Sequence, residues 1–131
     1  MYSILVADVP SMDARLTAAL KGYRLTFVYA LGDAERRLAR ERYDLVLIGL
    51  TFDDSRMFEM LRHVRTTVQS AQVPVVCLRA VPRSGFTMSS EGLRIACDAL
   101  NASAFLDLTA YLSANEADVA LLQTVEGLLK S

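Results

Sequence analysis

The sequence predicts an α/β fold built on one parallel sheet of five strands with helices on both faces. Five short apolar runs alternate with longer segments of helical periodicity, which is the pattern of repeated βα units. Most of the runs are apolar throughout, as expected for parallel strands that are covered on both faces. The runs comprise residues 4–7, 25–30, 45–50, 73–78 and 104–106.

The segments between the runs have the apolar spacing of amphipathic helices, with recurrences three, four and seven residues apart. The sets are Leu16, Ala19, Leu20 and Tyr23; Met57, Met60, Leu61 and Val64; Leu93, Ala96, Cys97 and Leu100; and Ala117, Leu121, Val125 and Leu128. Right-handed crossovers between such units force a parallel sheet. We therefore expect a single domain over residues 1–131 with the flavodoxin-like strand order 2-1-3-4-5.

Local signals indicate where these helices begin and end. Ser113 and Glu116 have the spacing of a capping box. Ser11 and Ser89 stand before other helical segments, where a hydroxyl caps the first free N–H groups. Gly22 follows the first helical segment, where a left-handed residue commonly ends a helix.

Composition excludes several classes of protein. Hydrophobic residues make up 53% of the chain and charged residues 22%, which is not the composition of a disordered chain. The formal net charge is −1, so we expect no binding to nucleic acid. No apolar run approaches the roughly 20 residues that span a membrane. No basic segment precedes the first run as in a signal peptide, so we expect a cytoplasmic protein.

The two cysteines, the single histidine and an arginine-rich helix are expected to have structural roles. Cys77 and Cys97 are too few for a disulfide framework and lie among apolar residues, so we expect buried free thiols. His63 is the only histidine, and a metal site needs several ligands. An arginine-rich helix contains the pair Arg37 and Glu41 and is expected to be a solvated face, with contact to an acidic protein as the alternative.

Six stretches of the chain stand in a characteristic order at strand ends and along helices. They are ILVAD (4–8), ALGDA (30–34), YDLVLI (43–48), MFEML (57–61), PVVCL (74–78) and NASAFL (101–106). Together they resemble the receiver domains of response regulators, the CheY-like family, over nearly the whole chain. The resemblance implies a signal-transduction role of the two-component or phosphorelay type, and a phosphorylation pocket where the strands end.

The chain departs from the family at that implied pocket. Asp8 keeps one acidic position, but Val9 replaces its acidic partner and Gly49 stands where the phosphoacceptor aspartate belongs. Arg79 replaces the residue whose hydroxyl contacts the phosphoryl group, and Leu108 replaces the lysine that pairs with it. One carboxylate cannot hold Mg²⁺, which needs several anionic oxygens. We therefore expect a pseudo-receiver with no metal, no cofactor, no aspartyl phosphorylation and no enzymatic activity.

The features that receivers use for protein contacts are retained. Phe105 occupies the aromatic position that receivers use as a rotamer switch. The resemblance also implies a partner or dimer surface formed by residues 91–101, 104–106 and 113–129. We expect signalling by protein–protein contact, with an unidentified protein or a second copy of the chain as the partner.

Two other functions remain open from the sequence. A receiver could be phosphorylated at an atypical carboxylate, Asp53, Asp54 or Asp8, although Asp53 and Asp54 are expected to cap a helix that begins near Ser55. A flavodoxin-like domain could bind a small molecule under the long segment 79–90, although no glycine-rich phosphate cradle is present. Arg79 is expected either to lie over Gly49 and pair with Asp8 or Asp53, or to point into solvent.

Overall fold

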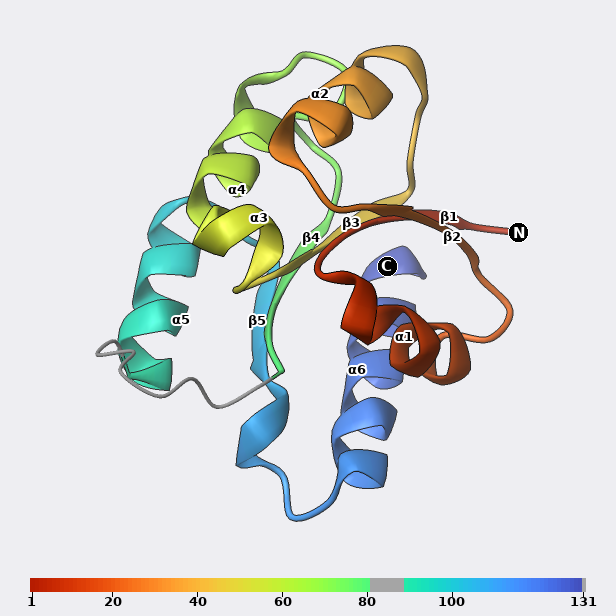
Figure 1. The fold of residues 1–131 in the computed structure, drawn as a ribbon, viewed down its shortest axis with the longest axis vertical. Helices are drawn as coiled ribbons and strands as arrows, with labels where there is room; N and C mark the ends of the chain where they lie inside the picture. Colours follow the sequence, from red (N-terminus) through yellow and green to blue (C-terminus); the bar gives the residue numbers. More distant parts are fainter. Residues whose placement is uncertain (81–88, 131) are drawn as a thin grey trace.

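A parallel five-stranded sheet forms the centre of the molecule, with the strand order β2-β1-β3-β4-β5 (Figure 1). The computed structural model describes residues 1–80 and 89–130. All neighbouring strands run parallel, so the predicted fold class and strand order are confirmed. The strands are β1 (Ser3–Ala7), β2 (Arg24–Val28), β3 (Leu45–Gly49), β4 (Val75–Arg79) and β5 (Ala104–Asp107).

Helices cover both faces of this sheet (Figure 1). The α-helical segments are α1 (Asp13–Ala19), α2 (Leu31–Arg40), α3 (Phe52–Ser55), α4 (Met57–Thr66), α5 (Ser90–Ala99) and α6 (Ala114–Leu129), and two short 3-10 turns are η1 (Pro10–Met12) and η2 (Leu108–Ala110). Helices α1 and α6 pack on one face, and α2, α4 and α5 on the other. In the described part of the chain no helix combines the length and the apolar content that crossing a bilayer requires.

Alternation along each strand explains why the runs are apolar throughout. In β1, Ile4 and Val6 face α1 and α6, whereas Leu5 and Ala7 face α2, α4 and α5. All five residues of the central strand β3 are buried. Successive side chains of a strand point to opposite faces, so a sheet with two covered faces needs apolar residues at every position.

Two of the predicted helix starts are confirmed, and one is wrong. The Ser113 hydroxyl accepts a hydrogen bond from Glu116 N at 3.1 Å, and the Ser89 hydroxyl accepts one from Gly92 N at 3.0 Å. Ser11 lies inside η1 instead of capping α1, because Pro10 begins a 3-10 turn and α1 starts only at Asp13. Gly22 has the expected left-handed conformation, with φ of 93°.

The segment after β3 turns in a way that the sequence did not indicate. Three of the four residues of α3, Asp53, Asp54 and Ser55, have φ values of 43°, 58° and 66°, so this element is not a regular right-handed helix. This left-handed conformation is costly for residues with a Cβ. The Asp53 carboxylate reaches across to α2, where Oδ2 accepts a hydrogen bond from Leu31 N at 2.7 Å. The prediction that Asp53 caps its own helix is therefore wrong, since it stabilises the first turn of α2.

This contact predicts unequal effects for the two neighbouring aspartates. Asp53→Ala should lower the free energy of unfolding by about 1 kcal/mol, as the loss of a helix cap does. Asp54→Ala is the matched control, because Asp54 is exposed and has the same left-handed backbone. Urea denaturation measures both variants, and equal losses would show that the backbone conformation, not the contact with α2, sets the effect.

Candidate functional site

The carboxyl ends of β1 and β3 bring Asp8 and Gly49 together. These two strands pair in parallel with Ala7 opposite Ile48, so the next residue of each strand lies at the same edge of the sheet. The Asp8 carboxylate occupies the space that a side chain at position 49 would need. An ideal Cβ on Gly49 would lie 2.1 Å from Asp8 Oδ1 and 2.2 Å from its Cγ, far inside van der Waals contact. The observed conformation of Asp8 therefore requires glycine at position 49.

Asp8 is a buried carboxyl whose loss of contact with water is only partly offset by hydrogen bonds. Its exposed fraction is 3%. Oδ1 accepts a hydrogen bond from Val9 N at 2.8 Å, and Oδ2 has no hydrogen-bond partner among the described residues. Burial raises the pKa of Asp8 to about 6, with the Val9 hydrogen bond opposing this rise and the charge of Asp13 adding to it. Ionising such a group inside the protein is unfavourable.

Little space is left around this carboxyl. The cavity above it has a volume of about 10 Å³ and is lined by Asp8, Val9, Met12, Gly49, Leu50, Thr51, Leu78 and Ala80. That volume is close to the minimum for one water molecule, so a phosphoryl group does not fit without rearrangement. Val9 packs against the core on the α1 and α6 side, and Leu108 is buried in the same core. Val9 and Leu108 thus contribute to packing, and Asp8 fills the space over Gly49.

The residues at this edge do not fit the magnesium ion that the resemblance implies. Mg²⁺ demands near-octahedral coordination by oxygen, normally from more than one acidic group. Asp8 offers one carboxylate, and its neighbours Val9 and Gly49 offer no side-chain oxygen. Within residues 1–80 and 89–130, no three acidic, histidine or cysteine side chains lie close enough together to hold a metal ion.

Arg79 lies in a polar cluster that joins β4, β5 and α5. In the pairing of β4 with β5, Arg79 stands opposite Asp107. Its Nη1 donates to the Ser90 hydroxyl at 3.1 Å, and that hydroxyl donates to Asp107 Oδ2. Asp107 Oδ1 accepts from Thr109 N at 2.9 Å. Partial burial raises the pKa of Asp107, but the hydrogen bonds from Ser90 and Thr109 and the charge of Arg79 outweigh it and leave the pKa lowered.

Both expectations for Arg79 are therefore wrong. Asp8 receives no hydrogen bond from it, and Asp53 is bound to Leu31 N and lies 4.0 Å from Arg56. The physical reason is strand alternation: Arg79 has the phase of Val75 and Cys77, whose side chains face α5. Gly49 has the phase of residues that face α1 and α6. The sequence contained an indication of this cluster, because an arginine and an aspartate stand at the ends of two adjacent strands. Such a cluster was not among the expectations from the sequence.

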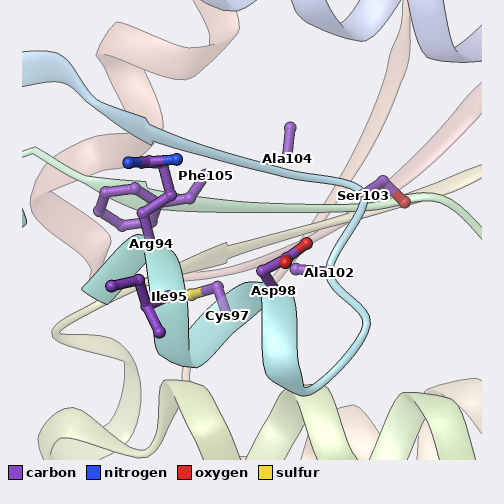
Figure 2. A pocket seen from close by; sticks show the side chains of 8 residues that line it. All are labelled: Arg94, Ile95, Cys97, Asp98, Ala102, Ser103, Ala104 and Phe105. Atoms are coloured by element: carbon purple, nitrogen blue, oxygen red, sulfur yellow. The ribbon is translucent and has the colours of Figure 1, made fainter. Parts of the chain in front are cut away.

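Phe105 contributes to a groove between α5 and β5, shown in Figure 2. The groove has a volume of about 320 Å³, and its lining consists of Arg94, Ile95, Cys97, Asp98, Ala102, Ser103, Ala104 and Phe105. Phe105 is half-buried against the core beneath α5. The groove lies on the surface that the resemblance assigns to partners.

The remaining residues have the structural roles that were expected. Cys77 and Cys97 are buried and free, and the hydrogen bond with Cys97 together with burial raises the pKa of the Cys77 thiol. His63 joins α4 to α2 through Nδ1, which lies 3.2 Å from Glu35 Oε2. The predicted pair of Arg37 and Glu41 is present at 3.1 Å. The small-molecule lid proposed for residues 79–90 falls mainly on residues 81–88, which lie outside the described residues.

Comparison with known proteins supports the fold assignment. No family model matches the chain, and no curated protein matches its sequence. One similar solved structure is the receiver domain of a sensor histidine kinase from Pseudomonas aeruginosa PAO1, which has a magnesium ion in its active-site cleft. It is 22% identical to this chain with a TM-score of 0.71, and the match covers 99% of this chain and 98% of that one. The receiver domain of a histidine kinase from Syntrophus aciditrophicus is 20% identical with a TM-score of 0.78, covering 99% and 91%.

A response regulator from Hahella chejuensis is similar to the same extent, with 21% identity and a TM-score of 0.75, covering 98% of this chain and 95% of that one. These three structures span almost the whole of each chain at low sequence identity. The chain therefore has the receiver fold.

The close approach of Asp8 and Gly49 predicts a strong coupling between these two positions. Gly49→Ala should lower the free energy of unfolding by about 1–3 kcal/mol, since the added methyl group overlaps a buried carboxylate. The same substitution in an Asp8→Ala background should cost less, because the overlapping atoms are gone. Urea denaturation of the four proteins in a double-mutant cycle measures the coupling, and independent effects would contradict the contact.

The raised pKa of Asp8 predicts a defined dependence of stability on pH. The folded state binds the Asp8 proton more tightly than the unfolded state, so this group stabilises below about pH 4 and its contribution is lost as pH rises through about 6. Relative to Asp8→Asn, which cannot ionise, the wild type should therefore lose up to about 3 kcal/mol between pH 4 and pH 7. Chemical denaturation across this range measures the difference, and a constant difference would contradict it.

Proposed function

We propose that the chain is a receiver-type signalling domain that acts through protein–protein contact without aspartyl phosphorylation. The observation that carries this proposal is the position of the Asp8 carboxylate, which fills the space over Gly49 where a phosphoacceptor side chain would stand. The receiver fold supports the signalling role. A cytoplasmic location belongs to the same proposal.

Phosphoryl transfer depends on positioning a nucleophile and neutralising developing charge. Position 49 offers no nucleophile, and Leu108 offers no cation at the position of the family's lysine. Asp53 is already bound to α2, and neither Asp53 nor Asp54 lines the cavity at the strand ends. These placements disfavour an atypical acceptor. The cavity at the strand ends is also much smaller than a site for a nucleotide or flavin, which disfavours such a ligand at that edge of the sheet.

The cluster of Arg79, Ser90 and Asp107 supports contact with a partner that is independent of phosphorylation. Ser90 is the first residue of α5, so the cluster connects the ends of β4 and β5 to the first turn of that helix. Charge-assisted hydrogen bonds of this kind are stronger than neutral ones. We infer that this cluster fixes the beginning of α5 against the sheet without a phosphoryl group.

Intact-mass spectrometry after incubation with acetyl phosphate and millimolar Mg²⁺ tests this proposal. We expect no mass increase of a phosphoryl group, with a conventional receiver domain in the same reaction as the positive control. A stoichiometric phosphoryl adduct would contradict the proposal. Its loss in Asp53→Asn, Asp54→Asn or Asp8→Asn would then identify the acceptor.

A further inference from the structure

Charge is distributed unevenly over the molecule. Residues 89–130, which form α5, β5 and α6, contain three times as many acidic side chains as basic ones. The acidic residues are Glu91, Asp98, Asp107, Glu116, Asp118 and Glu126, and the basic residues are Arg94 and Lys130. Over residues 1–80 basic residues slightly outnumber acidic ones. The surface formed by α5, β5 and α6, here called the α5–β5–α6 surface, is therefore the acidic part of the molecule.

Most of these charges are already paired within the chain. Glu91 pairs with Arg94, Asp118 with Arg15 and Glu126 with Lys130. Asp98 and Glu116 are exposed and form no ion pair within the described residues. Asp98 lies on α5 and Glu116 in the first turn of α6, and these two helices cover opposite faces of the sheet next to β5. The uncompensated charge of this surface is thus negative.

Apolar side chains are exposed on the same surface. Ile95 has an exposed fraction of 61% and lines the groove together with Phe105. Leu112, just before α6, is 95% exposed, and Val119 on α6 is also exposed. Figure 2 shows Asp98 pointing from α5 toward the beginning of β5, so the groove combines an apolar part with a carboxylate. A volume of about 320 Å³ is at the lower end for binding cavities, which suits a few side chains of a larger partner.

We propose that the α5–β5–α6 surface binds a positively charged segment of a partner protein, which inserts an apolar side chain into the groove between α5 and β5. This inference rests on the proposed function and specifies the chemistry of the partner. Basic side chains of the partner contact Asp98 and Glu116, while the apolar side chain contacts Ile95 and Phe105. Buried apolar contacts supply most of the affinity of such interfaces, and complementary charge supplies specificity and fast association.

Other occupants fit this surface less well. A symmetric dimer would bring the same surface of two copies together, and its surplus of negative charge would oppose association. Nucleic acid carries the same sign of charge and would be repelled. A basic protein segment is the occupant whose charge complements that of the surface.

The test is a titration of the full chain with a defined probe, an amphipathic peptide of leucine and lysine, followed by two-dimensional amide NMR and calorimetry. Two matched peptides carry glutamate in place of lysine or serine in place of leucine. We expect saturable binding of the leucine–lysine peptide only, with shifts concentrated in α5, β5 and α6. Affinity should fall as salt is raised, because exposed charges are screened.

Variants identify the surface residues that are responsible. Asp98→Lys should weaken binding by about fivefold or more, since an attraction becomes a repulsion, and Ile95→Ser should also weaken it. Glu59→Lys is the matched control, because Glu59 is an exposed residue of α4 and the change in net charge is the same. Absence of binding, equal binding of the glutamate peptide, or equal loss in Asp98→Lys and Glu59→Lys would overturn the inference.

Failure of this inference is distinguishable from failure of the proposed function. If the peptide binds only after treatment with acetyl phosphate, the surface is assigned correctly and phosphorylation independence is wrong. If no peptide binds and the mass does not change, the inference fails and phosphorylation independence stands. If sedimentation shows a dimer that Asp98→Lys strengthens and that excludes the peptide, the occupant is a second copy and the inference is overturned.

Discussion

The contact between the Asp8 carboxylate and the Cα face of Gly49 is the constraint on which the edge of the sheet depends. A residue with a Cβ at position 49 would collide with Asp8. The carboxylate in turn fills the space left by the missing side chain and leaves a cavity of only about 10 Å³. The two residues are therefore complementary in shape, although the burial of Asp8 is electrostatically unfavourable. An acidic residue of the chain therefore fills most of the space at the carboxyl ends of β1 and β3.

A second polar arrangement lies at the ends of β4 and β5. Arg79 at the end of β4 and Asp107 at the end of β5 are bridged by Ser90 of α5. The cation is on β4 and an anion is on β5, so the charges do not converge on the space above Gly49. They instead connect the sheet to α5, the helix that forms one wall of the groove between α5 and β5.

The fold could be predicted from sequence because its determinants are local and repeated. Apolar runs, helical periodicity and capping serines each act within a few residues, and together they specify the alternation of strands and helices along the chain, from which right-handed crossovers predict the parallel sheet. The positions of Asp8 and Gly49 could be predicted as well, because both directly follow strand segments. The contact of Asp53 with Leu31 could not, since it depends on three left-handed residues whose sequence carries no glycine. The expected pairing of Arg79 over Gly49 is wrong because alternation along the strands directs these two positions to opposite faces of the sheet.

The most direct measurement of the central claim is an NMR titration of the Asp8 carboxyl carbon, with and without millimolar Mg²⁺. The account predicts a midpoint near pH 6, set by burial over Gly49 and unchanged by the metal ion. A midpoint near 4 that is independent of Mg²⁺ would place the carboxyl in solvent. A midpoint that Mg²⁺ lowers would show that Asp8 is a metal ligand. Either result would contradict the account in which Asp8 occupies the place of the phosphoacceptor.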